Sequence, residues 1–185
     1  MSLAQRRAAA AKYQPKKVDL LLVAEAPPCT DGQYFYFEDV EKHDWLFRYV
    51  YEGLYNEKPD RDGKAGRLAM LRDARVFMTE LHEDNAEQPT LAQLAPHVPG
   101  LIDRIRALKP RRVILIKSSV YDAAYAPLAA AGIPVVDARM PFPASGQQGK
   151  FLTLFRAALA DANFTPPAPP ASAKSPATRR SAAGG

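Results

Sequence analysis

Short apolar segments alternate with segments of helical periodicity, and this alternation limits the fold of the chain more than any other feature. Apolar segments of strand length lie at 18–24, 75–79, 112–116 and 133–136. Helical spacing of apolar residues occurs at 43–56, 65–71, 94–108, 119–131 and 148–163. Fully apolar strands joined by helices are typical of parallel sheets covered on both faces. We therefore expect an α/β protein, a three-layer α/β/α sandwich around a four-stranded, mainly parallel sheet.

Charge divides the 185 residues into three parts. The net charge is +5, yet residues 1–17 hold five basic and no acidic residues, and residues 165–185 hold three basic and no acidic ones. We expect a basic N-terminal arm over 1–17, a single α/β domain over 18–164, and a tail over 165–185 that is too rich in Pro and Ala to form a core and is disordered. Basic arms suit the binding of a polyanion, although charged tails also simply keep a protein in solution.

Several classes of protein are excluded by what the sequence lacks. It has no apolar run near the roughly 20 residues of a membrane helix, so no membrane partner is expected. The N-terminus has charge but no apolar core of a secretory signal, which favours a cytoplasmic protein. The single cysteine, Cys29, excludes an internal disulfide framework and any site that needs several thiolates.

Binding and catalytic residues of parallel α/β sheets gather in the loops that follow the strands. The first such loop begins with the acid Glu25 and contains four consecutive aromatic residues, Tyr34, Phe35, Tyr36 and Phe37. Aromatic faces can stack on a planar ligand such as a nucleobase. Packing into the core is an equally good interpretation for any one of them.

The later loops add polar groups. The second begins at Glu80, a side chain placed to contact the edge of a base, whereas Glu83 and Asp84 favour a solvated acidic loop. The third, Lys117–Ser119, is either an anion site at a helix N-terminus or an ordinary serine cap. The fourth, residues 139–151, holds two prolines and two glycines before a helix.

In their order, these segments resemble the uracil-DNA glycosylase superfamily. Val23–Pro28 (VAEAPP) is similar to its first motif, particularly the GEAPG form of the thermophilic-type branch. Val76–Leu81 (VFMTEL) is similar to a strand that ends in Thr-Asn, and Leu108–Ala124 to the next strand and helix. Met140–Ser145 (MPFPAS) stands where the HPSP-type loop stands. The resemblance spans residues 18–160.

The resemblance implies an enzyme of base excision repair that flips uracil out of DNA and hydrolyses its N-glycosidic bond without a metal. Its partner would be uracil-containing DNA, single- or double-stranded, and the usual state of the family is a monomer. Glu25 would orient or activate water and stabilise the sugar cation, and Phe35 or Tyr36 would be the stacking platform. The implied substrate-binding set is Ala24, Ala26, Tyr34, Phe35, Tyr36, Glu80, Lys117, Met140 and Phe142.

The fourth loop would press into the minor groove of DNA and support the opened base stack. The residues that the resemblance places there are Pro143, Ala144, Gly146, Gln147 and Gln148. The usual wedge leucine is missing, so Gln147 or Gln148 would fill the space of the flipped base. A weaker wedge predicts a preference for single strands or mismatches.

Two departures from the family concern the chemistry of the pocket. Met140 replaces the HPSP histidine, and a thioether cannot donate a hydrogen bond to the departing base. Arg139, Ser145, Lys117 or a backbone N–H would have to replace that donor. Glu80 replaces the base-reading asparagine, and only a protonated Glu80, with its pKa raised by burial, both donates and accepts as an amide does.

The cysteines that hold an iron–sulfur cluster in the GEAPG branch are also missing, so we expect neither a cluster nor any other cofactor. The sequence leaves three hypotheses. The first is a divergent uracil-DNA glycosylase. The second is a catalytically silent nucleic-acid or nucleobase binding protein of the same fold. The third is an α/β enzyme that acts on a nucleotide or a small glycoside.

Overall fold

The computed structural model describes residues 2–30, 32–40, 44–60 and 62–168. The strands of this part are β1 (Leu20–Ala24), β2 (Val76–Glu80) and β3 (Arg112–Leu115). Its helices are α1 (Leu3–Lys12), α2 (Trp45–Tyr55), α3 (Lys64–Asp73), α4 (Leu91–Leu94), the short η1 (Ala95–His97), α5 (Val98–Leu108), α6 (Ser118–Ala130) and α7 (Gln148–Asp161).

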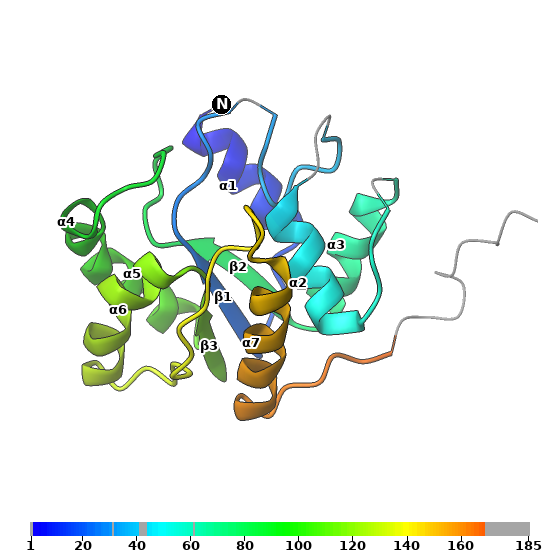
Figure 1. Ribbon diagram of the computed structural model, residues 1–185. Coiled ribbons are helices and arrows are strands. Elements are labelled where there is room, and N and C mark those ends of the chain that lie inside the picture. The colour runs from blue at the N-terminus through cyan, green and yellow to red at the C-terminus, as the bar shows by residue number, and fades with distance from the viewer. Residues whose placement is uncertain (1, 31, 41–43, 61, 169–185) are drawn as a thin grey trace, which may run out of the picture.

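The three strands form an open parallel sheet in the order β2-β1-β3. Leu20 at the start of β1 is in register with Val76 of β2 and Arg112 of β3. All five residues of β1 are buried, as expected for the central strand of a sheet covered on both faces. Helices α4, α5 and α6 lie on one side of the sheet and α2, α3 and α7 on the other (Figure 1). The prediction of an α/β fold with a parallel sheet flanked by helices is therefore confirmed.

The predicted fourth strand is corrected by the structure. Residues 133–136 make a single parallel bridge, between Val113 and Val135, and the described sheet has three strands. Val113 donates to the carbonyl of Pro134 at 3.0 Å, and Val136 donates to Val113 at 2.8 Å. Pro134 has no N–H with which to extend the ladder. Residues 133–136 therefore bond to β3 at one point without forming a strand.

Helices α2 and α7 pack against each other on one side of the sheet. Gly53 of α2 faces Phe155 of α7, and a Cβ at this position would overlap the phenyl ring. Both Phe155 and the neighbouring Phe151 are fully buried. A helix-weakening glycine in the middle of α2 is thus explained by the close approach of the two helices.

The N-terminal arm begins with a helix that is docked on the domain. Its first turn is closed by reciprocal hydrogen bonds between Ser2 and Gln5. Arg6 is 3% exposed, and its guanidinium donates to the carbonyl of Glu83 at 2.6 Å and to the side chain of Asn85. The helix therefore rests on the loop after β2, through a buried arginine instead of an apolar stripe.

The predicted tail falls largely outside the described residues, which end at 168. None of the helices in the described part of the chain is both long enough and apolar enough to span a bilayer.

Candidate functional site

A pocket of about 300 Å³ lies where the strands of the sheet end. Segments far apart in the sequence meet there, because parallel strands bring their carboxyl ends to the same edge of a sheet. The structure brings together eight of the residues predicted from the sequence, which are Ala24, Glu25, Ala26, Tyr34, Phe35, Glu80, Lys117 and Phe142.

Glu25 is held in one orientation by two donors from the neighbouring strand and helix. It directly follows β1, and its side chain is 11% exposed. The ammonium of Lys117, just after β3, donates to Oε2, and the hydroxyl of Ser119 donates to Oε1. A carboxylate accepts about four hydrogen bonds, so Glu25 retains capacity for a water or a substrate group.

The junction between β3 and α6 is built for side-chain chemistry and not for capping. Helix α6 begins at Ser118, so Ser119 lies within its first turn and uses its hydroxyl on Glu25. The N-cap residue is Lys117, whose side chain makes no capping hydrogen bond. The serine-cap interpretation is therefore wrong, and the anion bound at this junction is the carboxylate of Glu25.

Glu80 reaches the same pocket from the end of β2. Burial raises the pKa of its carboxyl group to about 7, although a backbone hydrogen bond and the positive charges of Arg6 and Arg104 oppose the shift. Arg104 also donates to the backbone carbonyl of Glu80 at 2.8 Å. Glu80 is thus protonated below about pH 7, the state in which a carboxyl group can both donate and accept a hydrogen bond.

The consecutive aromatic residues divide between pocket and core. Tyr34 and Phe35 line the pocket, and Phe35 packs edge-on against Phe47 with ring centroids 5.6 Å apart. Tyr36 is buried away from it, where its hydroxyl donates to the carbonyl of Met78 at 3.0 Å and accepts from the amide of Met78 at 2.7 Å. Of the two residues predicted as the stacking platform, Phe35 lines the pocket, whereas Tyr36 supports β2.

A buried ion pair fixes the wall formed by Tyr34. Lys64, at the start of α3, donates to Asp44 at 2.8 Å and to the carbonyl of Tyr34 at 3.3 Å. Burial lowers the pKa of Lys64, and Asp44 counteracts the shift. Asp44 also caps α2 by accepting from the amide of Phe47 at 3.0 Å. The aromatic loop and the start of α2 are thus tied together.

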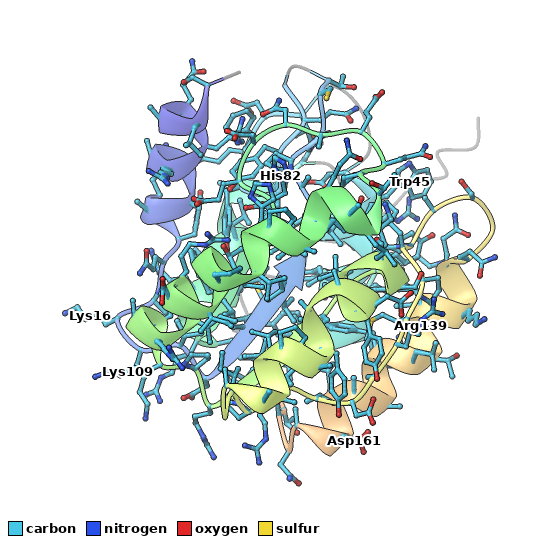
Figure 2. All side chains as sticks on the ribbon, turned by 90° about the vertical axis from the view of Figure 1, so that its left-hand side faces the viewer. Lys16, Trp45, His82, Lys109, Arg139 and Asp161 are labelled. Carbon is cyan, nitrogen blue, oxygen red and sulfur yellow. The ribbon has the colours of Figure 1, made fainter. Side chains whose placement is uncertain are left out.

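Three residues predicted near the chemistry lie outside the pocket lining. Arg139 forms a bidentate pair with Asp122 on the outer surface, with both N–O distances 2.8 Å (Figure 2). Met140 is packed in the hydrophobic core. Of the three side chains considered as replacements for the missing histidine, only Lys117 lines the pocket, since Ser145 lies in an exposed turn.

That turn lies between the pocket and α7. Its central residues, Ser145 and Gly146, both have positive φ, at 51° and 80°, and Gln147 donates back to the carbonyl of Ala144 at 3.0 Å. Pro143 is buried, and Gln148 begins α7. The turn follows Phe142, which is 38% exposed and lines the pocket. Of the residues predicted to contact DNA, Gly146 and Gln147 are thus exposed in this turn, whereas Pro143 is buried and Gln148 belongs to α7.

Trp45 is not among the residues predicted from the sequence. This residue starts α2 and lies outside the buried face of that helix. In the structure it is 40% exposed, lines the pocket, and stacks on Tyr49 with ring centroids 6.0 Å apart. Figure 2 shows Trp45 and His82 at the end of the molecule toward which β1 points. Trp45 and Phe142 are therefore exposed aromatic residues of the pocket lining.

The residues that the structure describes offer no cluster of ligands for a metal ion. Within them, no three His, Cys, Asp or Glu side chains converge as a metal site would require. Cys29 is exposed and forms no disulfide.

Comparison of the chain with models of known protein families gives no match. Comparison with curated proteins gives no significant match either.

Proposed function

We propose that this protein is a uracil-DNA glycosylase that hydrolyses the N-glycosidic bond of a flipped uracil in DNA. The observation that carries the proposal is the convergence of Glu25, Glu80 and Lys117, from the ends of three adjacent strands, on one pocket with an aromatic wall. A pocket of about 300 Å³ is at the lower end of the range found for small-molecule sites. The uracil-DNA glycosylase-like sandwich expected from the motifs is part of this proposal.

Phe35 and Glu80 would recognise the base. Phe35 offers a face for stacking, worth about 1–3 kcal/mol for one base. Protonated Glu80 would donate to O4 of uracil and accept from N3–H. These are the two hydrogen bonds that an asparagine amide at this position would make. The pKa of about 7 supports this role, because the carboxyl group is at least half protonated up to neutral pH.

Lys117 and Glu25 would stabilise the opposite charges that develop when the bond breaks. The departing uracil becomes an anion, and the Lys117 ammonium would donate to it in place of the missing imidazole. The sugar becomes cationic, and the Glu25 carboxylate would stabilise it and orient the attacking water. The contact between these two side chains supports the assignment, because the two charges arise at opposite ends of one bond.

The turn that follows Phe142 would contact the DNA. Its exposed residues follow the pocket residue Phe142 in sequence, and they would enter the gap that a flipped nucleotide leaves. Phe142 and Trp45 would flank the extruded nucleotide at the mouth of the pocket. A monomer acting in this way needs no second copy of the chain.

Release of free uracil from a uracil-containing oligonucleotide tests the proposal. The rate should fall by about 10²–10⁴ in Glu25→Gln and Glu25→Ala, the range typical of general acid–base residues. Glu87→Gln is the matched control, because Glu87 also lines the pocket but is exposed on the loop after β2. Equal rates in wild type and the Glu25 variants would overturn the assignment.

A silent binding protein of the same fold is the second candidate. One observation favours it: no histidine of the described residues lines the pocket. This candidate predicts binding of oligonucleotides that weakens with salt, without release of any base.

A further inference from the structure

We propose that Lys117 gives this protein a second activity, in which its amine forms a Schiff base with the abasic sugar and cleaves the DNA strand by β-elimination. The inference rests on the proposed function, because the abasic sugar is the product of uracil release. It adds a covalent step that hydrolysis of the N-glycosidic bond does not require.

The first support is the position of the amine. Nζ of Lys117 lies within one hydrogen bond of Glu25, the carboxylate assigned to the sugar carbon that loses its base. The side chain is 27% exposed and lines the pocket, so it is accessible to a bound sugar. An amine at this place can reach C1′ as soon as the base has left.

The second support is the backbone at Lys117. Its φ of 85° and ψ of 137° place an L-residue close to a region that essentially only glycine adopts. Such a conformation costs of order 1–3 kcal/mol and is found mainly at functional sites. The strained backbone carries a side chain that is used on Glu25 and not on the helix N-terminus.

Other described lysines show what is particular to Lys117. Lys109 also has a positive φ, of 48°, but lies in the ordinary left-handed helical region at the end of α5 and is exposed. It lies before β3, whereas Lys117 follows β3, and Figure 2 shows Lys109 at the end of the molecule away from Trp45. Lys64 is buried and engaged by Asp44. Lys109 is therefore a matched control for Lys117.

The chemistry needs no oxidant or reductant. The Lys117 ammonium becomes a neutral amine by giving one proton to the departing uracil or, on an abasic site made beforehand, to solvent. After water has added to C1′ and the sugar has opened, the amine attacks the aldehyde carbon, and one water is lost as the C1′=N bond forms.

Glu25 takes up one proton as water adds to C1′ and passes it to solvent. The restored carboxylate then removes a proton from C2′. The electron pair of that C–H bond forms the C2′=C3′ double bond, and the C3′–O bond breaks with its electrons leaving on the phosphate. Hydrolysis of the imine consumes the water released earlier and restores Lys117. The products are a strand with a 3′ unsaturated aldehyde and a strand with a 5′ phosphate.

Borohydride trapping on an oligonucleotide with a preformed abasic site tests this inference. Sodium borohydride reduces an imine to a stable amine, so a Schiff base leaves the protein covalently attached to the DNA. We expect a cross-link that peptide mapping places on Lys117. The yield should fall at least tenfold in Lys117→Arg, which keeps the charge, and in Lys117→Gly, which relieves the backbone, but not in Lys109→Arg.

Absence of a cross-link in the wild type would overturn the inference, as would a cross-link mapped to another residue. An undiminished yield in Lys117→Arg, with the melting temperature unchanged, would do the same. Because the abasic site is made beforehand, this result does not depend on uracil release. Conversely, uracil release without trapping would leave the proposed function standing and remove only the lyase step.

Discussion

Arg104 donates a hydrogen bond from Nη2 to the backbone carbonyl of Glu80 at 2.8 Å, and so binds α5 to the last residue of β2. Its Nη1 is paired with Glu83 at 3.0 Å. The guanidinium therefore holds the main chain of Glu80, a residue that lines the pocket. In the proposed function, the pH dependence of base recognition therefore comes mainly from the protonation of the Glu80 carboxyl group.

Activity on uracil should fall as pH rises through about 7, because Glu80 then loses the proton that it would donate to O4. Glu80→Gln supplies a permanent donor and acceptor, so its rate should stay flat across this limb. The pH dependence of kcat/KM for the two proteins checks the prediction. The same fall in both would place the titrating group elsewhere.

The stability of the fold should follow the same group. A raised pKa means that the native state holds a proton that the unfolded state has lost, so stability falls as pH rises from about 4.5 to about 7. Glu80→Gln should remove this slope and gain up to about 3 kcal/mol in the free energy of unfolding above pH 7. Urea denaturation at pH 5 and pH 8 measures the difference between the variants.

Phe35 and Tyr36 should have opposite mutational signatures. Tyr36→Phe removes both hydrogen bonds to Met78 at the outer edge of β2, and should cost about 1–3 kcal/mol of stability with little change in rate per folded molecule. Phe35→Leu should instead weaken catalysis through lost stacking. Denaturation and steady-state kinetics on both variants test this difference. A Tyr36→Phe protein that is stable but inactive would contradict the assignment of Tyr36 to the core and Phe35 to the pocket.

Arg6 and Arg7 are adjacent but should differ in their contribution to stability. Arg6→Ala removes a buried guanidinium with bonds to Glu83 and Asn85, and should cost about 1.5–3 kcal/mol. Arg7→Ala removes a largely exposed ion pair with Glu83 and should cost clearly less stability than Arg6→Ala. Equal free energies of unfolding would show that α1 is not held by Arg6.

Trp45 offers a direct optical probe, because it is the only tryptophan in the chain. A nucleobase entering the pocket should change its fluorescence, since Trp45 lines the same cavity as Phe35. Titration with a short uracil-containing oligonucleotide should give a saturable signal in wild type. Phe35→Leu should weaken the apparent affinity. Identical titration curves for the variant and the wild type would show that the oligonucleotide binds outside this pocket.

The main elements of the fold were accessible from the sequence because the central strand is buried on both faces. An apolar run such as Leu20–Ala24 needs no partner information to be recognised. The error at 133–136 came from Pro134, which keeps the apolar character of a strand but cannot extend its ladder. Docking of α1 could not be foreseen, because a buried arginine leaves no apolar period.

Those residues of the site that directly follow strands could be predicted from the sequence. Glu25, Glu80 and Lys117 were identified because each follows an apolar segment. Their partners were less predictable. The contact of Ser119 with Glu25 requires that β1 and β3 be neighbours, which only the order of the sheet shows. Phe35 and Tyr36 could not be distinguished because a loop has no period that assigns one side chain to the core.

Strand scission at abasic sites gives the most direct test of the central claim. End-labelled single- and double-stranded oligonucleotides, each with one uracil, hypoxanthine or xanthine, are incubated with the full chain in EDTA and then treated with hot alkali. We predict scission at uracil, with Glu25→Gln strongly impaired and Glu87→Gln unaffected. No scission at any of the three bases, while the oligonucleotides still bind, would contradict the account and identify a binding protein that lacks the glycosylase reaction.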